Sequence, residues 1–314
     1  MTAMSNNNDK KRLSDDDLRK KVARLRRAKK IYLPLGLIVW SLQAFLYPLV
    51  KIFSGFFDKI YSISPVWVPL LIFISPTVFG LSILQLWWES GKRIRAVVAD
   101  TLLPELLSEK FTHVTCDAKR GINKRVISSV KLVDLARFTG VNHFLGLHKG
   151  RKVEFADYDF SYSTQYGPTR TFFKGPWMIL DFGKQIPGRL RIRNRNGSSV
   201  SSSNTKSNIE SPNSEFNRRF QILADDLSSA IYILTPQFMD QILRASAAAN
   251  GQLLLCFEGS RVHVAINTGR ETFAVTGEEW EMISLDKLRD NFRQGIRHLT
   301  KIIDIICEGD GLVG

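Results

Sequence analysis

Four arginines alternate along a short predicted strand, and they are the strongest chemical signal in the sequence. They are Arg189, Arg191, Arg193 and Arg195. Every second side chain of a strand points to the same face, so the four guanidinium groups would form one row. Aligned like charges repel one another, and either bound anions or solvent beyond the strand end would relieve this repulsion. We predict the row as an anion-binding or partner-binding site, for lipid headgroups, an acidic protein surface or RNA.

Two neighbouring carboxylates, Asp225 and Asp226, are the candidates for catalysis. Paired carboxyl groups can divide the roles of general acid and general base, as hydrolases and transferases require. Adjacent aspartates also serve as caps and turns ahead of a helix, and a helical segment follows this pair. Exposure on a turn would favour the structural role, whereas convergence with another ionisable group in a pocket would favour an enzyme.

Metal and cofactor chemistry has little support in the sequence. Asp157 and Asp159 form a D-x-D pair, but the alternation of polar and aromatic residues places both on the exposed face of a half-buried strand. His143 and His148 lack the further carboxylate or histidine that a metal site needs. The three cysteines are far apart and form no C-x-x-C pair. We therefore expect no metal, no cofactor and no disulfide framework.

Two long stretches without a charged residue dominate the N-terminal third of the chain. They run over residues 31–50 and 60–88. Because about 20 apolar residues cross the hydrocarbon core of a bilayer, we predict a transmembrane hairpin over residues 31–88. A cleaved signal peptide is the alternative for the first stretch, but its charged leader would be long and no clear cleavage motif follows.

The charges beside these stretches predict an orientation. Residues 1–30 carry 11 Lys and Arg against four Asp. An excess of basic residues marks the cytoplasmic side, so we expect both termini on the inner side of a bacterial inner membrane, with this basic segment near anionic lipid. Nucleic acid would be another partner for such charge. The basic residues have no interleaved aromatic side chains for base stacking, however, which disfavours that partner.

The rest of the chain predicts a cytoplasmic domain. Apolar residues at helical spacing indicate a helical stalk over residues 89–111. Segments rich in aromatic and β-branched residues, separated by glycine-containing breaks, indicate strands. These segments are residues 141–147, 153–163, 170–182 and 189–193. Residues 194–214 are rich in Ser and Asn and are expected to be a flexible linker within a domain over residues 112–314.

Further strands and helices are predicted after the linker. In chain order they are a strand at 215–223, a helix from Thr235, a hairpin of 252–257 with 261–266, and a long helix at 285–307. Thr235 and Pro236 supply an N-cap and a first-turn proline, and Gly259 would allow the hairpin turn. Strands alternating with separate helices favour an α+β class with an antiparallel sheet. The expected fold is two transmembrane helices, then this sheet domain with its long C-terminal helix.

The segment that begins at Phe216 resembles the signature of a bacterial domain-of-unknown-function family numbered 3137. The matching residues are Phe216, Phe220, Asp225, Asp226, Ala230, Tyr232, Leu234, Thr235 and Pro236. A looser similarity extends over most of residues 30–310. The resemblance implies two membrane spans, a stalk, a strand-rich segment and a terminal helix, and it implies no established activity.

These patterns favour a membrane-tethered binding or scaffold domain with an unidentified protein partner. One alternative is a membrane-anchored hydrolase or transferase that uses Asp225 and Asp226. Another is a lipid-sensing domain similar to pleckstrin-homology folds, which the number of strands before a final helix suggests. The order of the strands in the sheet would decide between this last alternative and the others.

Overall fold

The structure is a computed structural model in which two compact units are distinguished. The described residues are 15–52, 67–133, 137–162, 169–195, 208–225, 227–274 and 285–308. One unit consists of residues 1–101 and 277–282, and the other consists of residues 102–276 and 283–314. The charged and aromatic side chains that form the candidate sites belong to the second unit.

Two long helices make up the described part of the first unit. They are α1 (Asp15–Ile52) and α3 (Trp67–Leu107), and the last turn of α3 belongs to the second unit. The two helices approach closely at Gly36, where an added Cβ would lie 3.1 Å from the Leu84 side chain. Large apolar side chains elsewhere on these helices stay exposed. They include Ile31, Leu35, Leu37, Ile38, Trp40, Val78, Phe79, Leu81 and Trp88.

The prediction of two membrane spans is wrong for this structure. Across the residues that are described, no helix combines the length and the apolar content needed to cross a bilayer. The apolar stretches of α1 and α3 are parts of longer helices, which also carry the basic N-terminal segment and charged residues after Trp88. Residues 53–66, which include the start of the second predicted span, lie outside the described residues. The predicted transmembrane fold and the multi-pass inner-membrane localisation are therefore not supported.

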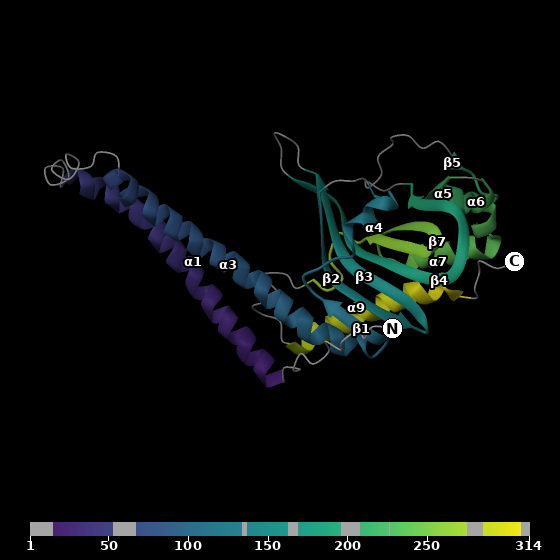
Figure 1. Ribbon diagram of the computed structural model, residues 1–314, viewed down its shortest axis with the longest axis horizontal. Coiled ribbons are helices and arrows are strands. Elements are labelled where there is room, and N and C mark those ends of the chain that lie inside the picture. The colour runs from purple at the N-terminus through teal and green to yellow at the C-terminus, as the bar shows by residue number, and fades with distance from the viewer. Residues whose placement is uncertain are drawn as a thin grey trace, which may run out of the picture. The chain divides into compact units, whose positions relative to one another are not determined.

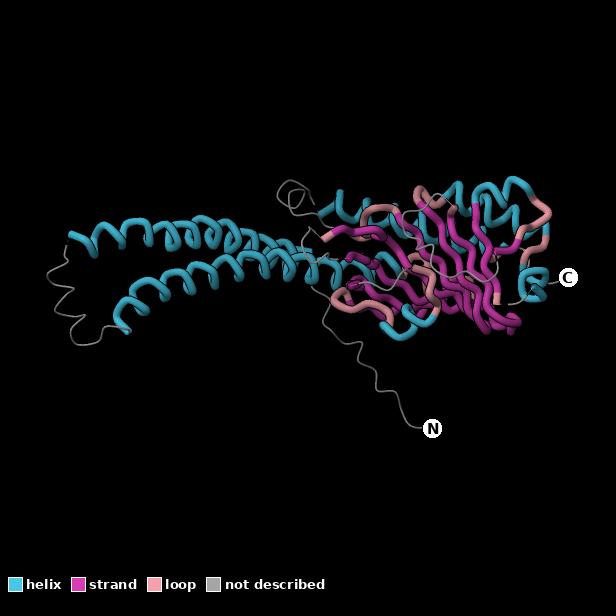
Figure 2. The backbone as a smooth tube through the Cα atoms, turned by 90° about the horizontal axis from the view of Figure 1, so that it is seen from above, coloured by secondary structure: helices cyan, strands magenta, loops and turns pink. Residues whose placement is uncertain are grey.

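The second unit is built on one antiparallel sheet of seven strands (Figures 1 and 2). The strands are β1 (Thr112–Asp117), β2 (Arg137–His148), β3 (Arg151–Tyr162), β4 (Arg170–Asn194), β5 (Asn208–Ile209), β6 (Phe220–Ala224) and β7 (Gln252–Asn267). Their order is β1-β2-β3-β4-β6-β5, and β7 also pairs with the long, bent β4. This path ends at β1 and β5, so the described strands do not close into the barrel that a pleckstrin-homology fold would need. The α+β class with an antiparallel sheet is what the structure has.

Helices cover both faces of the sheet. They are α4 (Lys124–Ser129), α5 (Ser214–Arg219), α6 (Leu227–Ile233), α7 (Pro236–Ala248) and α9 (Leu285–Ile306). Alternate residues of a strand point to opposite faces, which separates two sets of buried side chains. On one face, Tyr158 packs in a cluster with residues of the α4 segment. On the other face, Phe155 contacts Phe273, whose ring lies 5.4 Å from Phe292 of α9.

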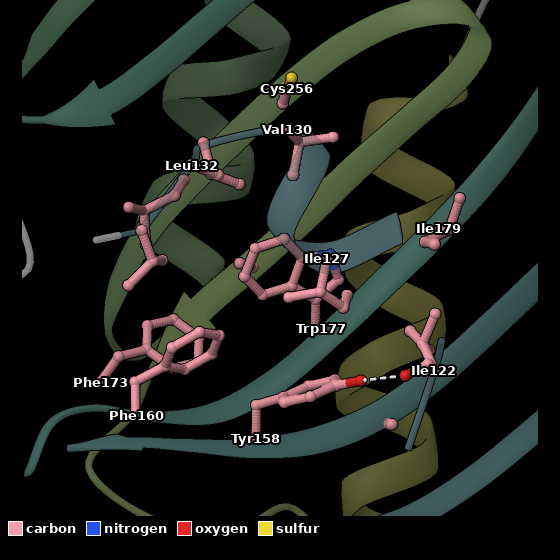
Figure 3. Packing of buried hydrophobic residues seen from close by; sticks show 14 residues of the cluster. Ile122, Ile127, Val130, Leu132, Tyr158, Phe160, Phe173, Trp177, Ile179 and Cys256 are labelled. Atoms are coloured by element: carbon pink, nitrogen blue, oxygen red, sulfur yellow. Dashed lines mark hydrogen bonds between the residues drawn. The ribbon is translucent and has the colours of Figure 1, made fainter. Parts of the chain in front are cut away.

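The cluster beneath α4 is dominated by aromatic rings from β3 and β4 (Figure 3). Trp177 is fully buried, and its ring centroid lies 6.0 Å from those of both Tyr158 and Phe160. The Tyr158 hydroxyl donates a 2.7 Å hydrogen bond to the carbonyl of Ile122, which ties the segment before α4 to the sheet. Aromatic pairs at such distances stabilise beyond the area they bury.

Two predicted elements after the linker differ from the structure. The segment predicted as a strand at 215–223 begins with helix α5, because Asn213 caps it by accepting a hydrogen bond from the Phe216 amide at 3.0 Å. The predicted hairpin of residues 252–266 is the single strand β7. Its partner β4 is equally continuous, and Gly259 (φ +60°) lies where the register shifts rather than at a chain reversal. Gly259, which lies between two apolar runs, therefore marks a bend in β7 and not a hairpin turn.

One sheet unites the segments on either side of the predicted linker. β4 precedes residues 194–214, and it pairs with β6 and β7, which follow them. Most of the predicted linker, residues 196–207, lies outside the described residues. The described remainder includes β5, which pairs with β6. The sequence left open whether these segments form one sheet or two domains, and the strand pairing gives one sheet.

Candidate functional site

Three of the four predicted arginines alternate along β4 and Arg195 follows its last residue, but each is engaged by its own chain. Arg189 Nε donates to Glu258 Oε1 at 3.1 Å, and Arg191 Nη2 lies 3.5 Å from Asp225 Oδ1. Arg193 is buried and donates to the carbonyl of Lys131. The remaining member, Arg195, is exposed, and its Nε donates to the carbonyl of Asn217 at 3.0 Å. The row therefore connects β4 to its neighbours, and its role in binding stays a prediction.

Replacing Arg193 by Gln should lower the free energy of unfolding by about 1–3 kcal/mol, because the buried Arg193 side chain loses the charged hydrogen bond that it donates to the Lys131 carbonyl. Replacing exposed Arg195 by Gln should change it by less than about 0.5 kcal/mol. Urea unfolding followed by circular dichroism measures both. Equally small losses would mean that Arg193 is a solvated member of an exposed row.

Of the candidate catalytic pair, only Asp225 belongs to the described part of the chain. Asp225 is exposed at the end of β6, and its amide donates to the carbonyl of Arg189 at 3.0 Å. Within the described part of the chain, its carboxylate forms an ion pair with Arg191. Asp226 lies outside the described residues. Exposure on the turn after a strand is the arrangement that favours a structural role over catalysis.

The D-x-D pair divides between interior and surface, so the prediction that both carboxylates are exposed is wrong for Asp157. Asp157 is fully buried and accepts hydrogen bonds from the Thr272 amide at 2.8 Å and from Asn142 Nδ2 at 3.1 Å. Burial raises its pKa to about 6, although these hydrogen bonds oppose the shift. The donors around it are neutral, so Asp157 anchors the loop after β7 to the sheet. Asp159, on the same strand, is half-buried and faces Lys174.

A basic cleft elsewhere in the second unit is the strongest candidate site. It is an open cavity of about 680 Å³. Its lining includes six Lys and Arg residues from four parts of the fold: Lys110, Lys149, Arg151, Arg244, Arg297 and Lys301. Two carboxylates, Asp304 and Glu308, also line it. Such an excess of cations around one concavity creates a positive potential in which anions concentrate.

A tight hairpin turn places three basic residues at the cleft. His148 at the end of β2 pairs with Arg151 at the start of β3, so the loop consists of Lys149 and Gly150 alone. Both loop residues have positive φ, at 50° and 79°. Two-residue loops of this kind match the twist of antiparallel strands, and glycine takes such a φ without strain. The turn fixes His148, Lys149 and Arg151 at one end of the hairpin.

Helix α9 supplies the second group of charged residues. Its buried face consists of Leu288, Phe292, Ile296, Leu299, Ile302, Ile303 and Ile306. Arg297, Lys301 and Asp304 follow one another at intervals of four and three, so they share another face. Arg297 and Lys301 make no ion pair within the described part of the chain. They are therefore the cations best placed to meet an anion from solution.

Helix α7 contributes Arg244. The helix begins as the sequence predicted, because Thr235 Oγ1 accepts from the Phe238 amide at 3.2 Å and Pro236 follows the cap. Arg244 Nη1 lies 2.8 Å from Glu308 Oε2 at the end of α9. Gln241 Nε2 donates to the Glu308 carbonyl at 2.6 Å, which joins the two helices at the cleft.

Asp304 contacts two basic side chains inside the cleft. Its Oδ1 lies 2.9 Å from His148 Nε2 and 2.9 Å from Lys149 Nζ. Burial opposes ionisation of Asp304, but these hydrogen bonds outweigh it and keep its pKa below the usual value. His148 Nδ1 lies 3.0 Å from the Lys110 carbonyl. Because both partners of the ring can only accept, His148 keeps both hydrogen bonds only when both nitrogens carry a proton.

Comparison with known proteins matches part of this domain to a family without an assigned activity. The family described as "Protein of unknown function (DUF3137)" matches residues 171–307, which include β4, β7, α7 and α9. No curated protein matches the chain. Among solved structures, the mycobacterial trehalose monomycolate transport factor A aligns with 12% identity and a TM-score of 0.33, over 67% of this chain and 96% of that one.

Proposed function

We propose that this chain, which belongs to the DUF3137 family through residues 171–307, is a binding protein whose α+β domain holds an anionic ligand in the basic cleft. The observation that carries the proposal is the charge around one cavity, where six Lys and Arg face two carboxylates. Its volume of about 680 Å³ falls within the range of small-molecule sites. The scaffold role predicted from the sequence stays a prediction.

Nucleophilic catalysis is the competing use of the same cleft, because Cys307, His148 and Asp304 all line it. In a catalytic triad, the carboxylate orients one ring nitrogen and the other takes the proton of the nucleophile. In this cleft the second ring nitrogen of His148 faces the Lys110 carbonyl at 3.0 Å. Both ring nitrogens therefore face other groups, Nε2 the Asp304 carboxylate and Nδ1 the Lys110 carbonyl, and this geometry favours binding over hydrolysis.

Replacing Arg297 and Lys301 together by Gln should weaken the binding of inorganic pyrophosphate by at least about tenfold, because two cations that make no ion pair within the described residues leave the cleft. Isothermal titration calorimetry of the full chain at low salt measures the affinity. Binding to the wild type should also weaken as salt rises, since ions screen charges beyond about 8 Å at physiological strength.

The matched control is Lys119→Gln with Arg270→Gln. Both residues are exposed and lie outside the lining of the cleft, and the change in net charge is the same. This control should keep the wild-type affinity within about twofold. If pyrophosphate binds both double variants equally, or does not bind the wild type, the cleft is not an anion site.

A further inference from the structure

The Asp304 carboxylate places a negative charge of the protein itself inside the basic cleft. One of its oxygens takes both His148 Nε2 and Lys149 Nζ, each at 2.9 Å. Its side chain is 41% exposed, and that of Lys149 is 70% exposed. The Lys149–Asp304 pair, with such access to water, contributes little to stability, whereas the His148 side chain is only 7% exposed. Because His148 and Lys149 both line the cleft, a soluble anion can take the place of the Asp304 carboxylate on them.

The cations of the cleft form two groups. His148 and Lys149 are already bound to Asp304. Arg297 and Lys301 lie on α9 seven and three residues before Asp304 and make no ion pair within the described part of the chain. A ligand with a single anionic group can pair with only one of these two sets of basic residues. A ligand with two anionic groups can satisfy both, and it gains the advantage of two linked contacts.

The tethered carboxylate also selects the type of anion. Because Asp304 is attached to α9 beside its partners, it competes at a high effective concentration. A free carboxylate offers the same charge and the same atoms, so it would lose this competition. A phosphate group carries a charge between about −1.5 and −2 at neutral pH and offers three strong acceptor oxygens. Phosphate is therefore the group that can displace Asp304.

The residues that line the cleft also restrict the chemistry of the part of the ligand that carries no phosphate. Among the described residues that line the cleft, none is Phe, Tyr or Trp. Recognition of a nucleobase relies on stacking against such side chains. The apolar lining consists of Ile303 and Ile305 on the C-terminal turns of α9, with Cys307 beyond them. A ligand recognised mainly through its charged groups fits this composition better than a nucleotide does.

We propose that the cleft selects a small molecule with two or more phosphate groups, one of which replaces Asp304 on His148 and Lys149. The inference rests on the proposed function, because it assumes that the cleft binds an anion. Asp304 then acts as a specificity-determining residue, since it excludes singly charged carboxylates and yields to phosphate.

The test compares the affinities of Asp304→Asn with those of the wild type for inorganic pyrophosphate and for acetate. Asparagine keeps an oxygen acceptor for Lys149 but lacks the charge. The variant should bind pyrophosphate about tenfold more tightly, because no tethered anion competes. It should also bind acetate more tightly than the wild type does, because a single carboxylate then meets no tethered competitor at His148 and Lys149. Glu105→Gln, an exposed change of the same charge outside the cleft lining, should leave both affinities within about twofold.

A second readout reports displacement directly. With 15N-labelled histidine, pyrophosphate should shift the Nε2 resonance of His148 in the wild type, because its partner changes from carboxylate to phosphate. An ADP titration separates free phosphates from nucleotides, and ADP should bind no more tightly than pyrophosphate. The assigned ligand class would be overturned if ADP bound more tightly than pyrophosphate. It would also be overturned if the wild type bound acetate more tightly than Asp304→Asn does.

The outcomes separate this inference from the proposed function. If Asp304→Asn leaves the affinity for pyrophosphate unchanged or weakens it, while the Arg297 and Lys301 double variant loses binding, the cleft binds anions but Asp304 does not compete with them. If neither variant differs from the wild type, both proposals fail.

Discussion

Replacing Trp177 by Ala should lower the free energy of unfolding of the sheet domain by about 3–5 kcal/mol. Trp177 is fully buried at the centre of the aromatic cluster, within 6.2 Å of the ring centroids of Tyr158, Phe160 and Phe173. The substitution leaves a cavity that the sheet cannot collapse to fill, because β4 is fixed by pairing with β3 and β7. It also removes the indole donor at 3.3 Å from His263 Nδ1.

Far-UV circular dichroism in urea measures this loss, since the signal does not depend on tryptophan fluorescence. Tyr232→Ala is the matched control, because it also deletes an aromatic ring but at a position that is 44% exposed on α6. That change should cost less than about 1 kcal/mol. A loss below about 1 kcal/mol for Trp177→Ala would mean that the cluster is not the core of the domain.

The parts of the fold that follow local patterns could be predicted from the sequence. The Thr235–Pro236 cap and the apolar period of 285–307 correspond to α7 and α9. Local patterns were less reliable where a partner segment decided the outcome. Gly259 suggests a hairpin turn, but the long β4 beside it keeps β7 in one strand. The span prediction relied on residues 31–88 alone and took no account of the longer helices α1 and α3, which contain residues 31–52 and 67–88.

The basic cleft could not be found in the sequence because its residues come together only through the fold. Lys110, the hairpin at Lys149, Arg244 and the face of α9 are separated by tens of residues or more. The available signal was the interval of four and three between Arg297, Lys301 and Asp304, which puts charges beside one another on a helix. The arginine row of β4 gave a clearer local pattern, yet Glu258, Asp225 and the Lys131 carbonyl occupy it from distant segments.

Replacing His263 by Gln should remove a loss of stability that the buried ring causes as the pH falls from 6.5 to 4. Burial lowers the pKa of folded His263 to about 4 from the usual 6.5, and the charge of Arg261 adds to the shift. Above pH 6.5 the ring is neutral in both states, and its contribution to stability is complete. As the pH falls, the unfolded ring gains a proton that the folded ring resists, so about 3 kcal/mol should be lost by pH 4.

Asp157 has the opposite effect and would hide this loss in the wild type. Its folded pKa of about 6 lies above the usual 3.8, so its contribution is complete below pH 3.8 and is lost as the pH rises through 6. The two buried groups titrate in overlapping windows with opposite signs. A pH profile of the wild type alone therefore says little about either, and the difference between wild type and variant is the informative quantity.

Urea unfolding of the wild type and of His263→Gln at pH 7, 6, 5 and 4 supplies that difference. Glutamine offers an oxygen that can accept from the Trp177 indole, so the variant should still fold. The stability of the wild type relative to the variant should fall by about 3 kcal/mol over this range, because only the wild type has the titrating ring. Parallel profiles for His263→Gln would show that the ring takes up protons as easily in the folded chain as in the unfolded one, and the buried Trp177–His263 pair would then have no part in acid sensitivity.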